Sequence, residues 1–90
     1  MDEAELHLYL GKQVKYLRHL ANFTQAQLAE KTNLSVNYVS EIETGIASPT
    51  LKTLLKLAQA LDVEIKELFN FDQRIPSKDI DRSKKKRETE

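Results

Sequence analysis

The stretch from residue 24 to residue 45, TQAQLAEKTNLSVNYVSEIETG, constrains the fold more than any other part of the chain. Thr24 is a favourable helix N-cap, and Gln27 three residues later completes a T-x-x-Q capping box. Asn33 stands where the chain must turn, and Asn tolerates the left-handed backbone better than other non-glycine residues. Gly45 supplies the C′ glycine at which a second helix ends. The stretch therefore predicts two short helices joined by a tight turn.

Apolar residues at helical spacing continue this pattern on both sides of the stretch. In the first predicted helix the buried face is formed by Leu10, Val14, Leu17 and Ala21. The predicted helices span residues 8–21, 25–32, 36–44, a segment after residue 50, and 64–69. No alternating strand pattern occurs anywhere in the sequence, so the chain is predicted to be all-α.

The fourth predicted helix follows the sequence Ser48-Pro49-Thr50, with Thr50 as its N-cap. Its inner face is expected to carry the apolar residues Leu51, Leu54, Leu55, Ala58 and Leu61. Asp62 is expected to take the turn that ends the helix.

Ninety residues suffice for one small domain with a single core. Residues 1–7 are expected to form an acidic, partly helical N-terminal arm, and residues 8–71 the folded domain. Residues 72–90, DQRIPSKDIDRSKKKRETE, are dense in charge and poor in apolar side chains, which predicts a disordered tail. Its basic block, residues 82–87, is compatible with contacts to phosphates and equally with a solubilising role.

Several function classes are excluded by what the sequence lacks. It has no cysteine, no apolar run long enough to span a membrane and no signal-peptide pattern, so we expect a cytoplasmic protein. His7 and His19 have no partner at metal-ligand spacing, and we expect neither a metal nor a cofactor. No nucleophile stands beside a base, so an enzyme is not expected.

Five pieces of the sequence, in order, resemble the lambda-repressor-like helix-turn-helix family of phage repressors and bacterial regulators. They are LGKQVKYLR, TQAQLAEKT, YVSEIETG, SPTLKTLLKLAQALDV and EIKELF, and together they run from about Leu10 to Phe69. The resemblance implies a compact five-helix bundle that binds double-stranded DNA, with the third helix in the major groove, on the nucleoid.

The resemblance also implies which residues read bases: the first two residues of the third helix and one residue a turn later. In this sequence they are Val36, Asn37 and Glu41. Asn can bond bidentately to adenine, Glu can accept from the cytosine amino group, and Val can touch a thymine methyl. A solvated helix face is the alternative for Asn37 and Glu41.

Contacts to the DNA backbone are expected from the start of the second helix and from the segment after the third. The residues are Gln25, Tyr38, Thr44, Ser48 and Lys52. Simple helix capping is the alternative for Gln25. Tyr38 can either pack against the second helix or reach a phosphate with its hydroxyl.

Family members pair an Arg of the first helix with a Glu near the end of the third. The resemblance therefore implies a buried ion pair between Arg18 and Glu43, because a buried Arg is tolerated only with a well-placed partner.

The charge of residues 1–71 is unfavourable for DNA binding, since seven Lys and Arg stand against nine Asp and Glu, a net charge of −2. One copy should therefore bind weakly, whereas a homodimer that pairs two half-sites removes the difficulty. The expected dimer surface is formed by Ile65, Phe69 and Phe71, which cluster near the end of the domain.

Alternatives within the family are an antitoxin, with a toxin as protein partner, and a controller of a restriction system. A protein-interaction module without DNA binding is a further alternative, and the slightly acidic domain supports it. Salt-dependent binding to random DNA distinguishes a DNA-binding member of the family from such a module.

Overall fold

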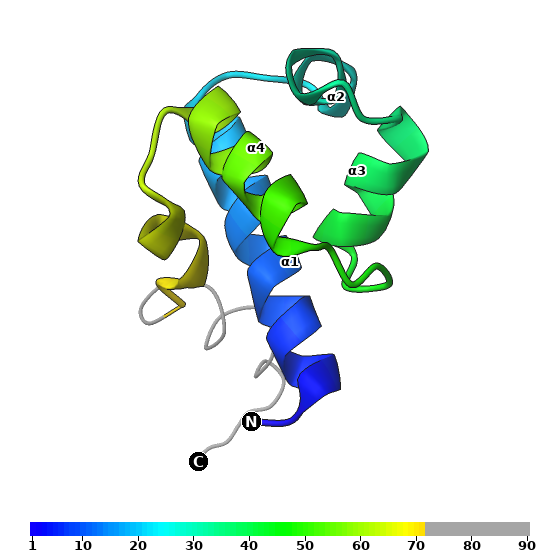
Figure 1. The fold of residues 1–90 in the computed structure, drawn as a ribbon, viewed down its shortest axis with the longest axis vertical. Helices are drawn as coiled ribbons and strands as arrows, with labels where there is room; N and C mark the ends of the chain where they lie inside the picture. The colour runs from blue at the N-terminus through cyan, green and yellow to red at the C-terminus, as the bar shows by residue number, and fades with distance from the viewer. Residues whose placement is uncertain (72–90) are drawn as a thin grey trace.

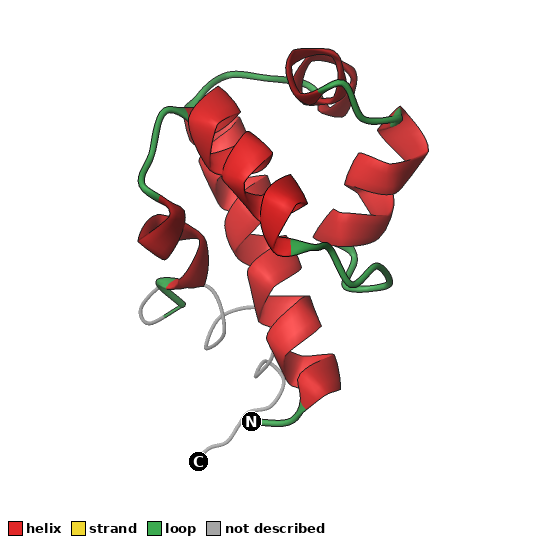
Figure 2. Cartoon of the chain, viewed as in Figure 1, coloured by secondary structure: helices red, strands yellow, loops and turns green. Residues whose placement is uncertain are grey.

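The computed structural model describes residues 1–71; the predicted tail 72–90 and its basic block lie outside the described residues. The elements are α1 (Glu3–Leu20), α2 (Gln25–Thr32), α3 (Val36–Glu43), α4 (Leu51–Leu61) and a 3-10 helix, η1 (Ile65–Phe69). In Figure 1, α1 and α4 lie at the centre, with α2 and α3 on one side and η1 on the other. Residues 1–71 contain no strand, which confirms the all-α prediction (Figure 2). None of these helices is long and apolar enough to span a membrane.

The first helix begins earlier than predicted, at Glu3 instead of residue 8. A capping box explains the difference. The Asp2 carboxylate accepts from the backbone N–H of Glu5 at 2.9 Å, and the Glu5 carboxylate accepts from the N–H of Asp2 at 3.1 Å. Acidic side chains in the first turn also stabilise a helix, because they lie near the positive end of its dipole. Residues 3–7 of the predicted arm are therefore the start of α1, about one and a half turns.

The turn between α2 and α3 agrees with the prediction from the sequence. The Thr24 hydroxyl accepts from the N–H of Gln27 at 3.0 Å, and the Gln27 side chain accepts from the N–H of Thr24 at 2.9 Å. Asn33 lies in the left-handed region with φ 59°. The Ser35 hydroxyl then caps α3 by accepting from the N–H of Tyr38 at 3.0 Å. Two side-chain caps and one left-handed residue thus set the angle between the two helices.

α1 and α3 cross at unusually close range, and Gly11 makes this possible. A Cβ atom at Gly11 would lie 2.3 Å from the carbonyl oxygen of Ile42, inside any van der Waals contact. Gly45, which follows α3, has φ +83° and ends the helix as predicted. The backbone of α3 is therefore seated directly on α1.

The core lies between α1, α4 and the helix pair α2–α3. Its buried apolar residues are Leu10, Val14, Leu17, Leu28, Ala29, Val39, Ile42, Leu54, Leu57, Ala58, Leu61 and Leu68. The predicted inner face of α4 was partly wrong, because Leu51 and Leu55 are 73% and 49% exposed while Leu57 is fully buried. At 100° per residue, Leu54, Leu57 and Leu61 share one stripe, and Leu51 and Leu55 lie to its side.

The last element differs from the predicted fifth α-helix, so residues 1–71 contain four α-helices where five were predicted. η1 is a 3-10 helix of five residues. It starts soon after Asp62, which takes a left-handed turn with φ 59° as expected. A segment this short cannot complete a stable α-helical ladder. Leu68 plugs η1 into the core, and the Gln13 amide donates to the carbonyl of Glu67 at 2.8 Å.

Candidate nucleic-acid interface

α3 has two unlike faces. Val39, Ile42 and Glu43 are buried against the rest of the bundle. Val36 and Asn37 are exposed, and Glu41 is half-buried. Val36 and Asn37 are thus exposed in the first turn of α3, and Glu41 lies one turn after Asn37, on the side of the helix away from Val39 and Ile42.

A hydrogen bond joins two of these three residues. The Asn37 side-chain N–H donates to a carboxylate oxygen of Glu41 at 3.3 Å, across one helical turn. Since a carboxylate only accepts, this bond sets the orientation of the Asn37 amide. The other N–H of that amide and its carbonyl oxygen remain available to a partner outside the helix. This link was not predicted from the sequence, in which each of the two residues was interpreted on its own.

Arg18 and Glu43 lie together beneath α3, as the family resemblance implied. The Arg18 Nε donates to Glu43 Oε2 at 2.7 Å, and Nη2 donates to Oε1 at 3.1 Å. The two side chains are only 8% and 2% exposed. Arg18 Nη1 also donates to the carbonyl of Phe23 at 2.8 Å, so the guanidinium ties α1 both to α3 and to the loop before α2.

Gln25, expected to reach a DNA phosphate, is the third member of this network. Its side-chain Nε2 donates to Glu43 Oε1 at 3.0 Å. The residue is half-buried at the first position of α2, where the backbone N–H groups of a helix start are not paired within the helix. The start of α2 is therefore attached to α3 through a buried carboxylate.

The other residues expected on the DNA backbone lie after α3, apart from Tyr38. Tyr38 is half-buried and packs against the core, which favours the packing alternative for its ring. The Thr44 hydroxyl donates to the carbonyl of Ser40 at 3.0 Å, within its own helix. Ser48 and Lys52 are exposed, on the loop before α4 and in its first turn. Ser48 and Lys52 therefore present their polar side chains to solvent.

The expected dimer surface also contains Tyr9, which was not predicted from the sequence. Phe71 is half-buried, with its ring centroid 5.7 Å from that of Tyr9 and 6.2 Å from that of Phe69. Phe69 is 41% exposed, and Ile65 is half-buried. Tyr9 was missed because it comes from α1, far away in sequence. The aromatic cluster Tyr9, Phe69 and Phe71 thus joins both ends of the domain.

Comparison with known proteins gives a consistent result. Residues 14–68 match the family described as Helix-turn-helix. The immunity repressor protein of Bacillus phage phi105 is 41% identical over 56 residues, which are 62% of this chain but only 39% of the repressor. The control protein C.BamHI of Bacillus amyloliquefaciens is 33% identical over 67 residues, 73% of this chain and 83% of that protein.

Among solved structures, the restriction-modification controller protein C.AhdI from Aeromonas hydrophila superimposes with a TM-score of 0.70 at 38% sequence identity. The similarity covers 73% of this chain and 98% of the controller. The likeness thus extends over the whole length of a small control protein, while it covers only part of the phage repressor.

Proposed function

This chain belongs to the lambda-repressor-like helix-turn-helix family of DNA-binding regulators, and we propose that it represses transcription as a homodimer on a specific double-stranded DNA site. The observation that carries the proposal is the two-faced α3: its inner face is locked to α1, and its outer face presents hydrogen-bonding and apolar groups. Relatives are named as repressors, regulators and control proteins, so we propose binding and not catalysis, in the cytoplasm on the nucleoid.

In this proposal α3 lies in the major groove. The Asn37 amide, oriented by Glu41, bonds to N6 and N7 of an adenine with its free carbonyl oxygen and its free N–H. Val36 touches a thymine methyl, and Glu41 keeps one carboxylate oxygen for a cytosine amino group. A carboxylate between phosphates is repelled by most sequences, so Glu41 restricts the site more than it tightens binding.

Contacts to the DNA backbone position the helix. The N–H groups at the start of α2 hold one phosphate, and Gln25 adds its side chain when it exchanges Glu43 for phosphate. Ser48 and Lys52 hold a phosphate on the other side of α3, and Thr44 and Tyr38 lie in reach of the same strand. Few cations are involved, so a single domain binds weakly.

Dimerisation supplies the missing affinity, and we propose the aromatic cluster Tyr9, Phe69 and Phe71, with Ile65 beside it, as its surface. Sedimentation at micromolar concentration should give a dimer, and Phe69→Ser should give a folded monomer. A strict monomer, both free and on DNA, would refute this part of the proposal.

A restriction-system controller is the second candidate within the family. It is supported by the coverage of C.AhdI and C.BamHI along nearly their whole length. An antitoxin, with a toxin as partner, has no such support from the named relatives. A pure interaction module is the alternative to be excluded by experiment.

Selection from a random DNA pool tests the proposal directly. We expect an enriched sequence with two half-sites about one helical turn apart, roughly 10 base pairs. Competition at fixed salt should then show a preference of at least about a thousandfold over random DNA. If no sequence is enriched and random DNA binds equally well, the interaction module is the better description.

A further inference from the structure

A groove lies between the last turn of α2 and the last turns of α4, away from the residues proposed to contact DNA. It has a volume of about 580 Å³ and is lined by Lys31, Thr32, Asn33, Lys56, Gln59 and Ala60. α3 contributes no residue to this α2–α4 groove. In the proposed complex α2 and α4 approach DNA with their first turns, at Gln25 and Lys52, whereas the groove is built from their opposite ends.

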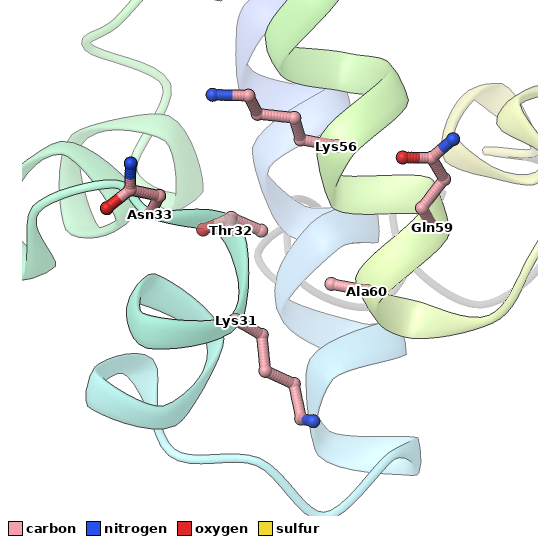
Figure 3. Close-up of a pocket in the computed structure, with 6 residues that line it drawn as sticks. All are labelled: Lys31, Thr32, Asn33, Lys56, Gln59 and Ala60. Atoms are coloured by element: carbon pink, nitrogen blue, oxygen red, sulfur yellow. The ribbon is translucent and has the colours of Figure 1, made fainter.

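The groove concentrates positive charge in a domain whose described residues are net negative. Figure 3 shows the Lys31 and Lys56 side chains extending from facing helices, with their ammonium groups towards opposite ends of the groove. No carboxylate of residues 1–71 pairs with either lysine, whereas Arg18 pairs with Glu43 and Lys66 with Glu64. The Lys31 ammonium nitrogen instead lies 5.2 Å from the centroid of the Phe23 ring. This contact holds the lysine side chain in place without neutralising its charge.

The lining indicates what kind of ligand fits. Small-molecule pockets are enclosed and mostly apolar, whereas five of the six residues here are polar and the groove is open to solvent. An extended segment covers such a surface better than a compact ligand does. The Asn33 and Gln59 amides, which also line the groove, can each donate a hydrogen bond to an oxygen.

We propose that the α2–α4 groove binds an acidic peptide segment of a partner protein, with one carboxylate on Lys31 and another on Lys56. Complementary charge gives this contact its specificity and its rate of formation, and its affinity is modest because exposed ion pairs are weak. A regulator that is bound to DNA through α3 keeps this groove free for the partner. The proposal does not depend on DNA binding.

Titration of the ¹⁵N-labelled full chain with a capped ten-residue peptide of alternating Glu and Ser tests the site. We expect amide shifts that saturate at Lys31, Thr32, Asn33, Lys56, Gln59 and Ala60. Because residues 82–87 are basic, shifts there are also expected, but they should not saturate with the groove. Shifts confined to the tail, or spread evenly over Lys12 and Lys15, would overturn the proposal.

Charge reversal provides the matched comparison. Lys31→Glu and Lys56→Glu should each weaken peptide binding by about three- to tenfold, since each replaces an attraction by a repulsion. Lys15→Glu makes the same change in net charge on the exposed side of α1 and should alter it less than about twofold. Equal losses in all three variants would mean that only net charge matters, and the proposal would fail.

The same variants separate a protein partner from DNA phosphates. Binding to random duplex DNA should fall no more for Lys31→Glu and Lys56→Glu than for Lys15→Glu. If it falls as much as peptide binding does, the groove is part of the DNA surface and not a peptide site. Circular dichroism of each variant verifies that the fold is retained, and loss of DNA binding in the unmodified chain would leave the peptide titration interpretable.

Discussion

The two faces of α3 differ in their contacts with the rest of the domain. On the inner face Val39 and Ile42 are buried in the core, and Glu43 accepts hydrogen bonds from Arg18 and Gln25. On the outer face, among residues 1–71, the Asn37 side chain bonds to Glu41 alone, within the same helix. The position of α3 is therefore set entirely from within, and the outer residues can change without moving it. Four experiments test this separation, beginning with the largest expected effect.

Removing Arg18 should do the most damage. Arg18→Ala leaves the Glu43 carboxylate buried without its cation, and we expect a loss of about 3–5 kcal/mol in the free energy of unfolding. Lys15→Ala, an exposed position on the same helix, should change it by less than about 0.5 kcal/mol. Urea titration followed by circular dichroism measures both. A wild-type midpoint for Arg18→Ala would show that the inner face does not depend on the ion pair.

Ile42 and Val36 provide a direct test of the two faces by truncation of apolar side chains. Ile42→Ala removes buried volume and should lower the free energy of unfolding by roughly 2–4 kcal/mol. Val36→Ala on the exposed face should change it by no more than about 0.5 kcal/mol. Similar losses in the two thermal melts would refute the distinction between the faces.

Asn37 tests whether the outer face reads sequence. Asn37→Ala should cost about 1–3 kcal/mol of binding free energy on the selected DNA site. On random DNA it should cost little, since a base contact carries the sequence information and phosphates do not. Gln25→Ala is the comparison, and it should weaken both kinds of DNA evenly. An unchanged ratio between specific and random DNA in Asn37→Ala would mean that α3 is not the reader.

Glu41 should give the smallest effect, with the opposite sign on random DNA. Glu41→Gln keeps the hydrogen bond to Asn37 but removes a negative charge near the phosphates. We expect random DNA to bind tighter by about 1 kcal/mol or less, while the preference at one base pair is relaxed. Competition binding at fixed salt measures both the affinity for random DNA and the preference at that base pair. Weaker binding to random DNA would show that the carboxylate does not face the duplex.

Local chemistry explains which features the sequence could predict. The caps at Thr24 and Thr50 and the turns at Asn33 and Asp62 depend on neighbours within four positions, and all four occur in the structure. The start of α1 was missed although Asp2 and Glu5 form the same kind of box, because the acidic composition was interpreted as an arm. The segment 64–69 was predicted as an α-helix although it is too short for a stable α-helical ladder, and it forms the 3-10 helix η1.

Features that depend on tertiary packing were harder to predict. Leu51 and Leu55 have the spacing of an inner face, but the bundle turns Leu57 inward and leaves them exposed. The bonds from Gln25 to Glu43 and from Asn37 to Glu41 depend on side-chain rotamers that no residue pattern specifies. The base-contact and dimer residues came from the family resemblance, and they stay predictions until tested.

The close crossing at Gly11 determines how α3 is oriented on α1. A methyl group at Gly11 would push the two helices apart. Its carbon would lie 2.3 Å from the carbonyl oxygen of Ile42, and that distance would have to increase by about 1 Å to reach an ordinary contact of 3.4 Å. That displacement would carry the outer face of α3 with it, and hydrogen bonds to base edges fail over such distances. Gly11 lies against the backbone of Ile42 and Glu43, so in the proposed complex a substitution at this one position would change how the outer face of α3 meets the DNA.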